Sequence, residues 1–266
     1  MFNFTLYKRS VRENINPLII FSALLILYFL IIISMFDPKF ASVLEGFTES
    51  MPELMSMFGM TSISSTLIGF MSTYLYGFIM LVFPMVFSIL CANKLVAHHV
   101  ESGAMTYLLA APISRPAVAF TQLKVLISGI STLIFLATIV GLVGCHAYFP
   151  GELDVPKFLL LNCGALCLQL FIGSVCFLSS CIFNDSKYSL AFGAGIPTLS
   201  LLLQMAASDG EKFKGLRFAS FFTLFNPEAL IAGKHSALWG LAILLAASFF
   251  FYFLGIVIFS KKDLHI

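Results

Sequence analysis

The sequence predicts an all-α polytopic membrane protein, with six transmembrane helices in one transmembrane domain over residues 1–266. Hydrophobic residues make up 59% of the chain and charged residues only 11%, against about 25% in soluble domains. The mean hydropathy is +0.99. A soluble domain of this length has too little interior to bury so much apolar surface. We therefore expect lipid to be the solvent for much of the chain.

The first element is predicted over residues 1–14, as a helix that lies along the membrane interface. At helical spacing Phe4, Tyr7 and Val11 share one face, and three basic residues accompany them. An apolar face beside basic side chains is typical of helices at the surface of an anionic leaflet. The alternative is a solvated basic tail.

Six apolar runs follow, and none of them contains Asp, Glu, Lys or Arg. Each is long enough to cross a bilayer, which takes about 20 residues in helical form. A membrane barrel would instead show short segments that alternate between apolar and polar residues. The predicted spans are 17–36, 66–93, 125–149, 158–183, 188–208 and 236–260.

The distribution of charge predicts the orientation of these spans. With the N-terminus inside, the inner segments carry nine basic and four acidic residues, and the outer segments carry six and nine. The positive-inside rule therefore favours a plasma-membrane protein with both termini in the cytoplasm, and a bacterial source is expected.

Two of the predicted outer segments are too long to be simple turns. Segment 37–65 contains a short amphipathic piece that begins with a proline, at 52–60, and segment 206–235 is rich in phenylalanine. We expect short helices there that pack on the outer ends of the spans, because irregular backbone near lipid must be buried or interfacial.

The sequence carries no recognisable catalytic or nucleotide-binding motif. It has no G-x-x-x-x-G-K-[ST] loop, no H-E-x-x-H and no G-x-S-x-G. The predicted spans also contain no charged residue of the kind that marks proton-coupled or ion-coupled transport. We expect no metal site, no cofactor and no nucleic-acid partner for this chain.

A polar stretch at 94–115 lies between two predicted spans, and we expect the rest of the chain to position it. It opens with charged and histidine side chains, continues as a short amphipathic segment with Met105, Leu108 and Leu109, and stops at Pro112. Two interpretations stay open at this point, a cytoplasmic docking element and an ordinary cytoplasmic loop.

With this stretch and the six spans in view, the chain resembles the ABC-2 type permeases, the membrane subunits of ATP-binding-cassette transporters. The resemblance rests on 100–115, on 52–60 and on the C-terminal pieces 221–233 and 259–266. The first of these departs slightly from the family pattern, because Thr106 stands one place later than usual. The residues of this stretch that match are Glu101, Gly103, Leu108, Leu109, Pro112, Ser114 and Arg115.

The resemblance implies a set of partners. Two permeases, identical or homologous, would pair into a twelve-span unit and bind two cytoplasmic ATPase subunits. ATP and Mg²⁺ would be held by those ATPases and not by this chain. The first and fifth spans would form the contact between the permeases.

The resemblance also implies roles for the polar stretch. Part of 94–115 would form a coupling helix that enters a groove on the ATPase, and 1–14 would be the connecting helix beside it. Glu101 and Arg115 would make polar contacts, while the apolar residues would be buried in the groove or against the permease. The implied ATPase-coupling residues are Glu101, Gly103, Tyr107, Leu108, Leu109, Pro112, Ser114 and Arg115.

The predicted function is that of an exporter subunit for an amphiphilic or hydrophobic substrate, because the spans offer no charged group for a small ion. One alternative is a membrane enzyme for lipid-linked substrates, for which His98, His99, Glu101 and Arg115 form the one candidate cluster. Another is an ATPase-linked module for sensing or immunity, without net transport.

Overall fold

The computed structural model describes residues 3–36, 66–105, 113–208, 215 and 218–262. In this part of the chain six helices are long and apolar enough to cross a membrane, and no residue is in a strand. The prediction of an all-α, multi-pass membrane protein is confirmed at this level.

The chain begins with helix α1 (Phe4–Glu13), where the sequence predicts an interfacial helix. Asn3 caps it, because its side chain accepts a hydrogen bond from the main-chain nitrogen of Leu6. Of the predicted apolar face, Tyr7 and Val11 are partly buried against the core. Leu6 and Ser10 are buried, whereas Phe4 is 68% exposed.

The first span is α2 (Ile15–Met35), and the second is assembled from consecutive helical pieces. These are α5 (Leu67–Tyr74), the π-helical turn η1 (Leu75–Ile79) and α6 (Met80–Leu95). The short helix α7 (Ala97–Glu101) follows α6. A π-helical turn inside a long helix is uncommon, and it comes shortly before Pro84.

The remaining spans are single long helices. They are α9 (Arg115–Tyr148), α10 (Val155–Ile182), α11 (Ser186–Ser208) and α13 (His235–Lys261). Their positions agree with the prediction except that α9 begins at Arg115, ten residues before the predicted start at residue 125. The predicted span began directly after Lys124, because its charge suggested a boundary, but this side chain is exposed and the helix already includes the ten residues before 125.

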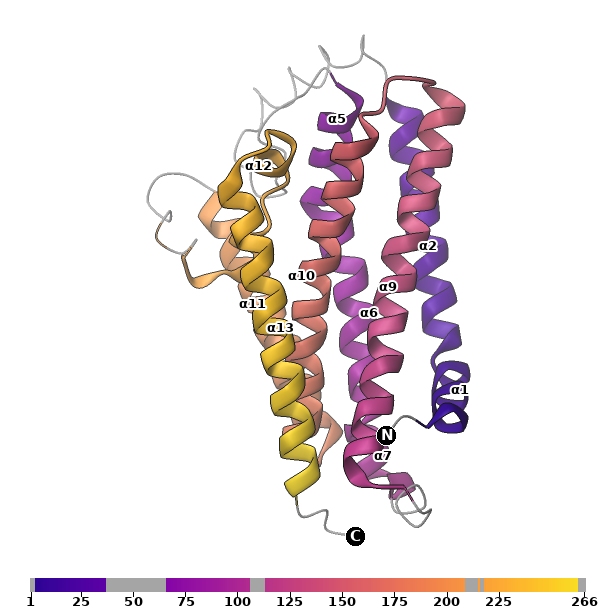
Figure 1. Cartoon of the computed structure of the whole chain (residues 1–266), viewed down its shortest axis with the longest axis vertical. Coiled ribbons are helices and arrows are strands. Elements are labelled where there is room, and N and C mark those ends of the chain that lie inside the picture. The colour runs from indigo at the N-terminus through magenta and orange to yellow at the C-terminus, as the bar shows by residue number, and fades with distance from the viewer. Residues whose placement is uncertain (1–2, 37–65, 106–112, 209–214, 216–217, 263–266) are drawn as a thin grey trace.

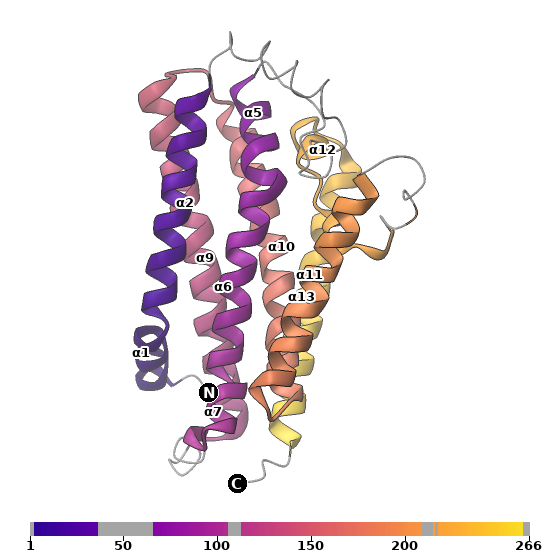
Figure 2. The ribbon, with the colours of Figure 1, turned by 180° about the vertical axis from the view of Figure 1, so that it is seen from behind.

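Figure 1 shows α10 in the middle of the bundle, with α1, α2 and α9 on one side and α11 and α13 on the other. Figure 2 shows the same arrangement from behind. Helix α10 packs on α6, α9, α11 and α13, and it is the most deeply buried of the six spans. Both views place α1, α7 and the C-terminal end of α13 at one end of the bundle, and α5 and α12 at the other.

Two glycines let α9 approach α10 and α2 closely. A Cβ atom at Gly141 would collide with the ring of Phe158 on α10. A Cβ atom at Gly144 would lie 2.9 Å from the Cδ1 atom of Ile33 on α2. Both glycines therefore allow close packing of α9.

Two short helices precede the last span, as predicted. They are η3 (Phe221–Leu224) and α12 (Pro227–Ile231), which Asn226 caps through its side chain. Helix α12 packs on α5, α10 and α13 at the end of the bundle opposite α1. The other predicted short helix, at 52–60, lies outside the described residues.

Candidate docking surface at the α7 end of the bundle

The predicted docking stretch begins where the second span breaks. Helix α6 ends at Leu95, and Val96 takes a non-helical conformation with φ −125° and ψ −69°. Helix α7 then ends at a turn in which Gly103 has a φ of +71°. This left-handed conformation favours glycine and is typical of a helix C-terminus. Ala104 and Met105 are helical again, and Met105 is buried in the core.

The first set of contacts joins α1 to the end of α6 and to α7. The ammonium group of Lys94 donates to the main-chain oxygen of Glu13 at 2.5 Å. His99 Nδ1 lies 2.5 Å from the Lys94 carbonyl oxygen. Because a carbonyl oxygen can only accept, that ring nitrogen carries the proton. His99 Nε2 then lies 3.5 Å from the Glu13 carboxylate, which also binds Arg9 at 3.0 Å.

The second set of contacts fixes α7 to the start of α11. Glu101 Oε2 accepts a hydrogen bond from the main-chain nitrogen of Ser186, at 3.3 Å. Asn93 donates from its side chain to the Ser186 hydroxyl at 2.8 Å. Ser186 is the first residue of α11. The Glu101 carboxylate therefore lies at a helix N-terminus, where a negative charge is favoured.

The third set of contacts fixes the start of α9 to the end of α13. Arg115 donates to the main-chain oxygen of Lys262 at 3.0 Å. The ammonium group of Lys262 in turn donates to the main-chain oxygen of Cys181, near the end of α10, at 3.0 Å. Partial burial lowers the pKa of Lys262 below its ordinary value.

The structure therefore places four of the eight predicted coupling residues. Glu101 and Arg115 both make polar contacts, but these are contacts within the chain. Gly103 forms the turn after α7, and the main-chain oxygen of Ser114 accepts the first hydrogen bonds of α9. The other four lie outside the described residues: Tyr107, Leu108, Leu109 and Pro112.

Sequence reasoning missed the partners of these residues. Glu13, Ser186 and Lys262 all contact the docking stretch or its flanks, yet each lies more than 80 positions away from its partner. No local pattern marks them. The one available signal was that all three fall in segments assigned to the same side of the membrane.

In the cluster considered for an enzyme, three of the four side chains have separate partners within the chain. Both ring nitrogens of His99 face the partners described above, while Glu101 binds Ser186 and Arg115 binds Lys262. His98 is exposed on α7. Among the described residues no three His, Cys, Asp or Glu side chains lie close enough together to hold a metal ion.

The fold and this surface define the chain as a helical multi-pass membrane protein in which polar contacts link the helices at the α7 end of the bundle. No protein-family model, no curated protein and no solved structure matches the chain.

Proposed function

We propose that the chain is the membrane permease of an ABC-2 type exporter. In this proposal separate ATPase subunits dock on the 94–115 stretch at the cytoplasmic face of the plasma membrane. A second permease, identical or homologous, completes the transporter. The chain itself has no phosphate-binding loop, so the energy for transport comes from ATP and Mg²⁺ bound to the partner subunits.

One observation supports the proposal. Polar contacts fix both ends of the docking stretch to other helices of the bundle. The end of α6 is fixed to α1 through Lys94, α7 pairs with α1 through His99 and binds α11 through Glu101, and the first residue of α9 is fixed to the end of α13. A force applied between these two ends would reach helices on both sides of the central helix α10. Such bracing suits an element that passes a rigid-body motion from a partner into the spans.

The proposed substrate is amphiphilic or hydrophobic. The six spans contain no Asp, Glu, Lys or Arg in their predicted cores, so a charged solute would cross without compensating charges. Transport assays in vesicles test this part of the proposal. Movement of hydrophilic solutes alone would contradict it.

Co-purification with ATPase subunits from the same source tests the docking itself. The variant is Leu108→Asp with Leu109→Asp, which places charge on the two leucines expected to enter the ATPase groove. We expect the amount of ATPase that co-purifies with this variant to fall about tenfold or more, because the variant loses an apolar anchor.

The matched control is Lys8→Asp, which changes charge on an exposed residue of α1 at the same end of the bundle. It should retain the ATPase. Equal retention by all three proteins, or no ATPase with the wild type, would contradict the proposed docking.

A further inference from the structure

Glu13 binds or faces three groups at the place where α1 meets α6 and α7. Its main-chain oxygen accepts a hydrogen bond from the ammonium group of Lys94. Its carboxylate oxygen Oε1 binds Arg9 at 3.0 Å, and its other oxygen, Oε2, faces His99 Nε2 at 3.5 Å. The side chain of His99 is 15% exposed and that of Glu13 is 32% exposed. Both side chains are therefore partly shielded from water, yet protons from the solvent can still reach them.

The neutral form of His99 leaves its contact with Glu13 without a proton. The Nδ1 atom donates to the main-chain oxygen of Lys94 at 2.5 Å, and a neutral imidazole ring carries only one N–H. Nε2 therefore presents a lone pair to the Glu13 carboxylate, which is itself an acceptor. Their separation of 3.5 Å is longer than a hydrogen bond between nitrogen and oxygen. The two groups face each other without being bonded.

Protonation of Nε2 would turn this contact into a charge-assisted hydrogen bond. The new N–H would donate to Glu13 Oε2, and the positive ring and the carboxylate would attract each other. Bonds of this kind have lengths of about 2.7–2.9 Å. Histidine is the side chain whose charge ordinarily changes between about pH 5 and 8. The contact is therefore made at the acidic end of this range and is lost as the pH rises.

Other charged or titratable groups lie on the elements around His99. Among the described residues Glu13 is the one acidic side chain within 4.0 Å of the His99 ring. The other acidic side chain of α7, Glu101, accepts from the main-chain nitrogen of Ser186 at the start of α11. Glu13 is therefore the group that responds to the charge of His99. The remaining groups are Lys8, Arg9 and Arg12 on α1, Lys94 on α6, His98 on α7, and Asp185 and Lys187 beside Ser186.

We propose that His99 and Glu13 form a proton-operated latch between α7 and α1. When His99 binds a proton, the latch closes and fixes the docking stretch more tightly to α1. When His99 is neutral, the latch is open, and Lys94 still links the end of α6 to α1. The consequence for an ATPase partner rests on the proposed function, whereas the latch itself is a property of this chain alone.

Nitrogen-15 NMR of the histidine rings tests the proton positions in the wild-type chain. The protein is held in phosphatidylcholine nanodiscs, because this lipid does not titrate between pH 5.5 and 8. The chain has five histidines, and the signals that disappear in His99→Gln identify His99. We expect the Nδ1–H tautomer of His99 at pH 8 and a doubly protonated ring at pH 5.5. The Nε2–H tautomer at pH 8 would overturn the proposal.

Glu13→Gln tests the pairing, because glutamine keeps the shape of the side chain and removes its charge. We expect the proton affinity of His99 to fall about two- to tenfold in this variant, the effect of losing one ionic partner. The exposed neighbour His98 is the internal control, and its titration should be the same in both proteins. Glu101→Gln is the matched variant, which should change the titration of His99 less than Glu13→Gln does. A His99 titration that is unchanged in Glu13→Gln would overturn the latch.

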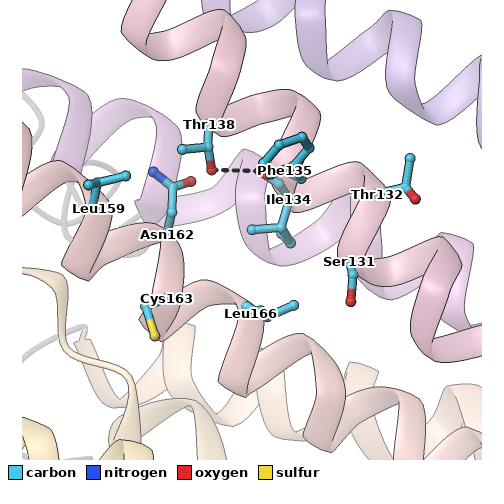
Figure 3. Close-up of a pocket in the computed structure, with 9 residues that line it drawn as sticks. All are labelled: Ser131, Thr132, Ile134, Phe135, Thr138, Leu159, Asn162, Cys163 and Leu166. Carbon is cyan, nitrogen blue, oxygen red and sulfur yellow. Dashed lines mark hydrogen bonds between the residues drawn. The ribbon is translucent and has the colours of Figure 1, made fainter.

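Two spin labels test whether the latch changes the contact between the helices. Arg12→Cys on α1 and His98→Cys on α7 place the labels at exposed positions beside the pair. Cys163→Ser removes the one exposed cysteine of the six. That residue lies in an apolar groove between α9 and α10, away from the α7 end of the bundle (Figure 3). We expect a narrower range of distances between the labels at pH 5.5 than at pH 8.

The same labels in the Glu13→Gln background should give equal distance ranges at the two pH values. A distance range that does not change with pH when Glu13 is present would overturn the proposal. None of these measurements uses an ATPase. Failure of the latch would therefore leave the proposed docking standing, and a failure to recover any ATPase would leave the latch standing.

Discussion

Gln169 supplies the hydrogen bond that Pro84 withholds from its own helix. Proline has no main-chain N–H, so the carbonyl oxygen of Met80, four residues earlier, loses its helical donor. The side-chain nitrogen of Gln169 on α10 donates to that oxygen at 2.9 Å, and to the oxygen of Leu81 at 2.9 Å. Gln169 is fully buried. The irregular part of the second span is thus held by the central helix.

Replacing Gln169 by leucine should lower the stability of the bundle by about 1–3 kcal/mol, because two main-chain oxygens would lose a buried donor. Unfolding in mixed micelles measures this. Pro84→Ala restores an N–H for the Met80 oxygen, so the double variant should lose about 1 kcal/mol less than the two single losses together. Strictly additive losses would mean that Gln169 does not act through the site of Pro84.

Gly240 on α13 should not accept even one methyl group. A Cβ atom there would collide with the main-chain oxygen of Leu224 in η3, and backbone cannot rotate aside. We expect Gly240→Ala to cost about 1–3 kcal/mol of stability, as overpacking of a core does. Gly195→Ala on α11 is the matched control, because a Cβ atom there meets nothing within 4 Å. The melting temperature should fall for the first variant and hold or rise for the second.

The turn after α7 should depend on the backbone freedom of Gly103. Its φ is +71°, and a Cβ atom there would meet no other atom within 4 Å, so any cost comes from the backbone alone. Gly103→Val should be destabilising and should weaken ATPase retention, since a β-branched residue is strongly disfavoured at positive φ. Gly103→Asn should be milder, because asparagine tolerates this region. Equal behaviour of the two variants in both measurements would contradict this role of the turn.

The N-terminal cap of α10 should contribute stability that depends on pH. Asp154 accepts a hydrogen bond from the main-chain nitrogen of Lys157 and pairs with its ammonium group at 3.0 Å. The side-chain hydrogen bond with Lys157, followed by the main-chain one, lowers the pKa of Asp154 below its ordinary value. The stabilisation is therefore present above that ordinary value, and it is lost as the pH falls through the lower folded-state pKa.

Asp154→Asn tests the cap, because asparagine also caps helices but does not titrate. The difference in melting temperature between wild type and variant should shrink as the pH is lowered from 6 to 3. A difference that stays constant over this range would show that the charge of Asp154 does not matter.

The sequence was sufficient for the spans but not for their contacts. Uncharged runs located all six long helices, and Asn3 and Asn226 are ordinary capping residues before two of the short ones. The start of α9 was missed because Lys124, which is exposed, was read as a boundary. The contact of Gln169 with Met80 joins residues 89 positions apart. Only the packing of α10 against α6 brings them together, and no local pattern encodes that packing.

The same holds for the candidate docking surface, where the residues could be predicted but their contact partners could not. The resemblance singled out Glu101 and Arg115, and their residue types predicted polar contacts. It could not indicate that Ser186 and Lys262 would be the partners, because a main-chain nitrogen and a main-chain oxygen make those contacts. Main-chain groups carry no sequence signature.

ATP hydrolysis by the purified chain together with its co-purified partner, in lipid vesicles and with added amphiphiles, tests the central claim most directly. The proposal predicts that ATPase activity accompanies the wild-type chain and is stimulated by an amphiphile. It also predicts that stimulation is lost in the double variant Glu101→Ala with Arg115→Ala. This variant removes two contacts that fix the docking stretch to the bundle, while Leu108 and Leu109 remain. Absence of any ATPase from the purified wild type, or stimulation that is unchanged in the double variant, would contradict the account.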